Sequence, residues 1–254
     1  MSMTDGQRSA SDAQLSLGLD EEPAAWHVRR SPRARRLSVR VYPGGRVEVV
    51  VPRGVGARLV QRFVLGHRTW IARKVDEMRT LAPVAVNRLP QDVELAAVGE
   101  RWLVHRTDIR ALGAAVSDGL LLVLPERDEK RAYRILHAWL RARARYVLEP
   151  WLRRVAGEIG IDFERLEIRR QCTRWGSCSR SGAISLNVCL LFQRSEVVRY
   201  LLVHELCHRR HMNHSRHFWA LVGRHEPSFR SLDGELGQGW RQVPDWVFRD
   251  LRAD

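Results

Sequence analysis

The stretch His204-Glu205-Leu206-Cys207-His208 constrains this chain more than any other feature of its sequence. In a helix, residues four apart leave the same face one turn from each other, so the two imidazoles can meet a single zinc ion. Glu205 projects about 100° away from them around the helix. Its carboxylate can therefore reach a water molecule at the metal without ligating the metal, which is the geometry a general base needs.

The residues before the motif predict that it lies in a buried helix. Ser195 and Glu196 can cap the start of this helix. The apolar residues that follow are nearly continuous, as in a core helix: Val197, Val198, Leu201, Leu202, Val203 and Leu206. Met212 and Asn213 come after the motif, and Asn tolerates the left-handed conformation that ends a helix. We expect the chain to reverse there.

A tetrahedral zinc site needs a third ligand from another direction. The candidates after the motif are His211, His214, His217 and Glu226. His211 would share the helix of the first two ligands, where three nitrogens would be strung along the axis. Glu226 precedes a proline in a segment with few signals for a helix. His214 stands six residues after His208, as in the extended motif H-E-x-x-H-x-x-G-x-x-H, although His211 replaces the Gly. The spacing leaves His214 and His217 open.

Other stretches resemble a known family. They are R-W-G-S-C-S at residues 174–179, G-A-I-S-L-N at 182–187, and the helix motif followed by N-H-S and F-W. A weaker likeness covers R-R-S-P-R-A-R-R-L-S-V-R-V and G-R-V-E-V-V-V-P-R-G-V in the amino-terminal half. Together these stretches resemble the YgjP-like metallopeptidase family of zincins, which are relatives of the SprT-type proteases.

The resemblance implies a function and a set of site residues. It implies hydrolysis of peptide bonds with one zinc ion per chain, held by His204, His208 and His214, and with Glu205 as the general base. The choice of His214 rests on the N-H-S segment, whose His aligns with that of the family. The resemblance also implies that residues 183–188 form an edge strand beside the metal cleft. The cleft candidates are Arg174, Trp175, Ser177 and Asn187.

The pattern along the chain predicts an α+β fold. Residues 1–24 are polar and predict a disordered amino-terminal segment. Residues 25–125 predict a β-rich subdomain with a hairpin around Pro43-Gly44-Gly45 and one amphipathic helix from Val60 to about Thr80. Residues 126–254 predict a minimal zincin-like domain. It begins with a long Arg-studded helix from Arg131 to about Gly157, with Pro150 inside it.

Charge raises the question of an anionic partner. The formal net charge is +14, but Lys occurs only at 74 and 130, so an Arg bias across the whole chain accounts for nearly all the positive charge. We expect a peptide or protein substrate. We also keep open a salt-sensitive contact of the hairpin with nucleic acid or another polyanion. The residues for that contact are Arg29, Arg30, Arg33, Arg35, Arg36, Arg40 and Arg46.

Two alternative functions remain on sequence grounds. An Arg-rich cleft with a zinc site would also suit a nucleotide phosphohydrolase, and a structural zinc would suit a nucleic-acid-binding module. Glu205 argues against the module, because a structural site has no use for a carboxylate beside an open position. The sequence lacks a signal peptide and an apolar run of the ~20 residues that span a bilayer. We therefore expect a cytoplasmic protein without membrane contact, with its four Cys as free thiols.

Overall fold

The computed structural model describes residues 26–32, 34–42, 45–81, 89–107, 115–116, 120–171 and 173–249. It divides the chain into two units, Met1–Val84 and Ala85–Asp254. The predicted disordered segment of residues 1–24 lies outside the described residues.

The first unit is built on strand β3 (Val47–Pro52), whose residues are all buried. It pairs antiparallel with β2 (Ser38–Val41), which confirms the predicted hairpin. It also pairs parallel with β1 (Trp26–Ser31), so β3 is the central strand of the order β1-β3-β2. Two neighbours therefore flank β3, so both of its edges are paired within this sheet.

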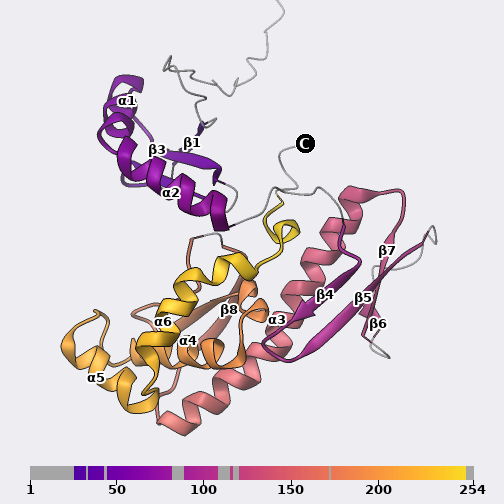
Figure 1. Ribbon diagram of the computed structural model, residues 1–254. Coiled ribbons are helices and arrows are strands. Elements are labelled where there is room, and N and C mark those ends of the chain that lie inside the picture. The colour runs from indigo at the N-terminus through magenta and orange to yellow at the C-terminus, as the bar shows by residue number, and fades with distance from the viewer. Residues whose placement is uncertain are drawn as a thin grey trace, which may run out of the picture. The chain divides into compact units, whose positions relative to one another are not determined.

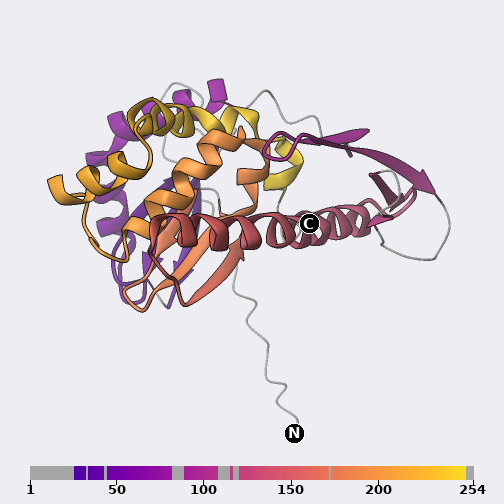
Figure 2. The same cartoon turned by 90° about the horizontal axis from the view of Figure 1, so that it is seen from below.

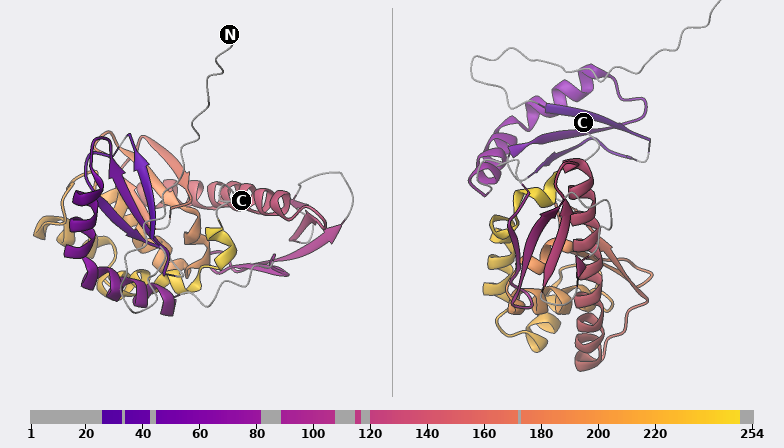
Figure 3. Two further views of the ribbon diagram at one scale, coloured as in Figure 1. Left: turned by 90° about the horizontal axis from the view of Figure 1, so that it is seen from above. Right: turned by 90° about the vertical axis from the view of Figure 1, so that its right-hand side faces the viewer.

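Two helices cover one face of this sheet (Figure 3). They are α1 (Ala57–Gly66) and α2 (Arg68–Leu81), where the sequence predicted one helix. The break is at His67, whose φ of −112° and ψ of 6° leave the helical region. The apolar positions still pack as one face, because valines of β3 and of both helices share one core.

The other face of the sheet carries part of the Arg-rich hairpin. Glu48 is buried there, and its carboxylate pairs with Arg29 at 3.1 Å and with Arg40 at 3.8 Å. Two of the seven arginines are thus ion-paired within the sheet, and Arg33 lies outside the described residues. The contact of this hairpin with a polyanion stays a prediction.

The second unit is built around α3 (Glu129–Ile159), a helix of 31 residues that confirms the predicted long helix. The Asp128 carboxylate caps its start by accepting from the Arg131 amide, and Gly160 ends it with a φ of +66°. Pro150 lies within the helix without ending it. Buried leucines along α3 give it an apolar face that runs past both sheets of the unit (Figure 2).

A four-stranded sheet packs on α3. Its strands are β4 (Asp92–Leu95), β5 (Glu100–Thr107), β6 (Ala115–Val116) and β7 (Leu121–Pro125), in the order β4-β5-β7-β6. Trp102 of β5 meets Trp139 of α3 edge to face at 5.2 Å, and Arg143 of α3 pairs with Glu100. Because these strands share the core of α3, the structure divides the chain at 84/85 and not at the predicted 125/126.

The remaining sheet comprises β8 (Arg165–Arg169), β9 (Gly176–Cys178) and β10 (Ala183–Asn187), in the order β8-β10-β9. The expectation that residues 183–188 form an edge strand is wrong. Strand β10 is central, because it pairs parallel with β8 and antiparallel with β9. The edge strands of this sheet are β8 and β9, and β9 belongs to the R-W-G-S-C-S segment.

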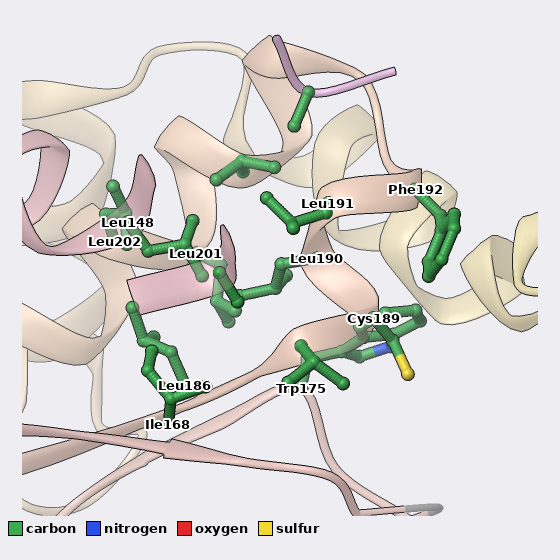
Figure 4. Packing of buried hydrophobic residues seen from close by; sticks show 14 of the residues in the cluster. Leu148, Ile168, Trp175, Leu186, Cys189, Leu190, Leu191, Phe192, Leu201 and Leu202 are labelled. Carbon is green, nitrogen blue, oxygen red and sulfur yellow. The ribbon is translucent and has the colours of Figure 1, made fainter. Parts of the chain in front are cut away.

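Helices complete the unit after β10. The 3-10 turn η2 (Val188–Phe192) leads into α4 (Ser195–Cys207), α5 (Arg216–His225) and α6 (Phe229–Gln238), shown in orange and yellow in Figure 1. Two further 3-10 turns follow, η3 (Gly239–Gln242) and η4 (Asp245–Phe248). Residues of η2 and α4 pack on β8 and β10 in the main core (Figure 4). The described helices and mixed sheets confirm the α+β fold. None of these helices combines the length and apolar character needed to cross a bilayer.

His137 of α3 holds the final turn, η4, against α3 by a hydrogen bond. It also predicts how the stability of the fold depends on pH. Its Nε2 donates to the Trp246 carbonyl at 2.8 Å, and Arg170 donates to its other nitrogen at 3.0 Å. Burial lowers the pKa of His137 to about 4, and the Arg170 charge also lowers it. The unfolded chain therefore binds more protons between pH 6.5 and 4, so stability falls as the pH falls through this window.

We expect this His to cost on the order of 2 kcal/mol of unfolding free energy between pH 6.5 and pH 4.5. Denaturant unfolding at both pH values measures it. In His137→Gln the pH dependence should be smaller by that amount, because Gln can donate to Trp246 and does not titrate. Identical pH profiles of the two proteins would contradict the assignment.

Candidate metal centre

Helix α4 carries the first part of the site. Most of its residues are buried, as the continuous apolar stretch predicted. The predicted cap differs: Arg194 is the N-cap and makes no side-chain cap hydrogen bond, while the Ser195 hydroxyl donates to Glu196. The helix is held by packing. His204, Glu205 and His208 therefore stand on a rigid element in the core.

The chain reverses after α4 without a left-handed residue at Met212 or Asn213, contrary to the prediction. Leu120 is the residue other than Gly with a positive φ in the described part of the chain. Tight turns make the reversal, in which the amides of residues 209–211 donate to the last carbonyls of α4. The Ser215 hydroxyl then caps α5 by accepting from the Phe218 amide. His214 lies immediately before this cap.

The three imidazoles of His204, His208 and His214 meet at one point. The His204 Nε2 lies 3.3 Å from that of His208 and 3.1 Å from that of His214. Nitrogens that share a tetrahedral zinc lie about 3.3 Å apart, so the donor set fits such an ion. Burial, with the two neighbouring imidazoles, lowers the pKa of His204 to about 3. His204 is thus neutral near pH 7, the form that binds a metal.

Glu205 is not one of the three grouped ligands and is 4% exposed. Burial raises the pKa of its carboxyl to about 8, and the charge of Arg174 acts in the opposite direction. Within the described part of the chain, Oε2 has no hydrogen-bond partner. A carboxylate oxygen that is buried and unpartnered is costly, which is typical of a group kept for chemistry.

Strand β9 passes directly over this carboxylate. A Cβ added at Gly176 would lie 2.5 Å from Glu205 Oε1, closer than real side chains approach. Gly176 therefore lets the strand and the Glu205 carboxylate come together. Strand β9 and helix α4 meet at this point.

The sequence of this chain matches a known family over most of its length. The family described as YgjP-like, metallopeptidase domain, matches residues 35–238. The chain belongs to the YgjP-like metallopeptidase family. No curated protein matches the chain. A crystal structure of the metallopeptidase zymogen of Pyrococcus abyssi abylysin is 24% identical and has a TM-score of 0.33. The match covers 35% of this chain and 91% of that one.

The other ligand candidates of this YgjP-like chain lie apart from the cluster. His204, His208 and His214 are the one group of possible metal ligands in the described ranges. The rings of His211 and His217 face each other at 6.1 Å, and Glu226 is the C-cap of α5. Cys178 and Cys207 are free thiols outside the cluster, and Cys172 lies outside the described residues.

The predicted cleft residues have different places. Arg174 is exposed and acts electrostatically on Glu205, and Ser177 is half-buried on β9. Trp175 is buried, packs in the core (Figure 4) and stacks on Trp240 at 4.0 Å. Asn187 is buried too. Its amide donates to the carbonyls of residues 171 and 174 and its oxygen accepts from Cys189, so it holds the loop before β9.

Sequence reasoning missed the residues around the ligands. The Tyr200 hydroxyl lies between His204 Nδ1 and the carboxylate of Asp233. Trp219 stacks on His214 at 5.5 Å and forms one wall of a hollow of about 670 Å³ between α5 and α6. Tyr200 had a signal, because it precedes His204 by four residues and so shares its helix face. Asp233 had none.

Proposed function

We propose that this metallopeptidase is zinc-dependent and that Glu205 is its general base. One observation carries the proposal. Three imidazole nitrogens converge at zinc spacing, and Glu205, which follows the first of them on the same helix, carries a buried carboxylate oxygen that has no partner among the described residues. A zinc ion bound there supplies Lewis acidity, which polarises the scissile carbonyl and makes a water molecule a better nucleophile.

Hydrogen bonding at Nδ1 fixes the tautomer in which Nε2 can ligate a metal, as His208 shows. His208 Nδ1 lies 3.0 Å from the carbonyl oxygen of His211. A carbonyl only accepts, so Nδ1 carries the proton and Nε2 keeps its lone pair for a metal. The side-chain packing fixes the ring in addition, because Phe218 stacks on His208 at 4.5 Å.

Glu205 would move the proton. As the water oxygen bonds to the carbonyl carbon, Oε2 takes a proton from the water. The carboxyl then gives this proton to the amide nitrogen as the C–N bond breaks, so the base is regenerated. Burial, which raises the pKa of this group to about 8, makes the carboxylate a stronger proton acceptor for the first transfer.

Strand β9 would hold the substrate. It pairs with β10 on one side, and no described strand pairs with its other side. An extended peptide can add to such an edge through main-chain hydrogen bonds. The proximity of Gly176 to Glu205 supports this placement, because a peptide on β9 would pass beside the base.

The test is metal removal with a proteome-derived peptide library. We expect about one zinc per chain, cleavage of library peptides, loss of cleavage after chelation, and recovery when zinc is restored. A nucleotide panel runs in parallel. Zinc-dependent phosphate release without peptide cleavage would overturn the proposal, as would cleavage that survives complete removal of the metal.

A further inference from the structure

We infer that Tyr200 and Asp233 form a hydrogen-bonded pair that positions His204 for metal binding, and that Asp233 acts only through Tyr200. The inference rests on the proposed metal centre and adds two positioning residues from different helices. Neither residue belongs to the group of possible metal ligands. Their effect is therefore on the affinity for the metal.

The hydrogen bonds have a direction that the chemistry fixes. Tyr200 is 0% exposed, and its hydroxyl donates to Asp233 Oδ1 at 2.7 Å. That donation uses its single proton, so the lone pairs of the same oxygen face His204 Nδ1 at 3.3 Å. The Nδ1 must then carry a proton and donate. His204 Nε2 is left unprotonated and directed at His208 and His214.

The arrangement differs from that of the neighbouring ligand. His208 Nδ1 is held by a backbone carbonyl within its own turn, whereas His204 is held by side chains of α4 and α6. Asp233 thereby links α6 to the first ligand. A carboxylate at the end of such a chain makes the hydroxyl a better acceptor and the imidazole a better ligand.

The experiment measures the zinc dissociation constant by competition with a chelator for four proteins: wild type, Tyr200→Phe, Asp233→Ala and the double variant. We expect each single variant to bind zinc roughly 10–100-fold more weakly. The double variant should bind no more weakly than Tyr200→Phe, because Asp233 has no route to His204 without the hydroxyl. The absorption spectrum of bound Co²⁺ gives a second readout, which should change in both single variants.

Glu235→Gln is the matched control. Glu235 also lies on α6, but its carboxylate accepts from Arg194 at 2.8 Å and does not contact His204. Its loss tests whether loosening α6 alone weakens zinc binding, and we expect wild-type affinity. Asp233 is exposed, so Asp233→Ala tests the inference even if Tyr200→Phe fails to fold.

The outcomes separate the inference from the proposed function. A wild-type protein that binds no zinc would overturn the metal centre and the inference together. Zinc-binding wild type with unchanged affinity in Asp233→Ala would overturn the inference alone. So would additive losses in the double variant, or an equal loss in Glu235→Gln, because each would show that Asp233 acts by another route.

Discussion

Glu205→Gln is expected to lower kcat for peptide hydrolysis by roughly 10²–10⁴-fold while zinc remains bound. Gln has the same shape and fits the same buried space beside Gly176, but its amide cannot take a proton from water. The three imidazoles are untouched by the change, so the ion should stay at about one per chain. The measurements are turnover of a peptide identified from the library and the zinc content of the same samples.

Glu196→Gln is the control for this variant. Glu196 is exposed and lies in the first turn of the same helix, whereas His204 lies in its last turn. Its carboxylate contacts Arg194 and Ser195. We expect wild-type turnover from it. If Glu205→Gln keeps the wild-type kcat with its zinc in place, Glu205 is not the base and the proton must be taken elsewhere.

His214→Ala is expected to lower zinc occupancy and abolish hydrolysis. Its Nε2 is one of the three nitrogens of the cluster, and removal leaves two ligands from a single helix. The loss of affinity should exceed the roughly 10–100-fold that residues around the ligands contribute. Zinc content after dialysis against a weak chelator measures it, together with turnover at saturating zinc.

His211→Ala and His217→Ala provide the comparison for His214. Both are histidines of the same segment, and their rings contact each other outside the nitrogen cluster. We expect both variants to retain zinc and activity. Full zinc in His214→Ala with loss in either of the other two would show that the third ligand has been misassigned.

The proposed ligand positions could be derived from sequence because they are local. Helix periodicity alone places His204 and His208 on one face and Glu205 off it. The spacing could not choose between His214 and His217, since that choice depends on how the turn after α4 runs; the family resemblance favoured His214. The turn itself was predicted at Asn213 and is made instead by backbone hydrogen bonds at residues 208–211.

The parts that failed depend on pairing between distant segments. The parallel pairing of β1 with β3, and the central place of β10, leave no mark on the hydrophobic pattern of either strand. For the same reason, the structure divides the chain at 84/85, inside the predicted β-rich subdomain of residues 25–125. Strands β4–β7 read as an independent β-rich region until Trp102 is seen against Trp139, which joins them to the core of α3.

Gly176 and Glu205 lie so close together that the residue at one position restricts the residue at the other. A larger residue at 176 would collide with the carboxylate, so the Glu205 side chain would have to shift or be replaced by a shorter one. Either change would displace or remove the proposed base, and selection for hydrolysis would act against such a variant. A relative that carries a side chain at 176 is therefore expected to have a displaced or absent carboxylate and to lack hydrolytic activity.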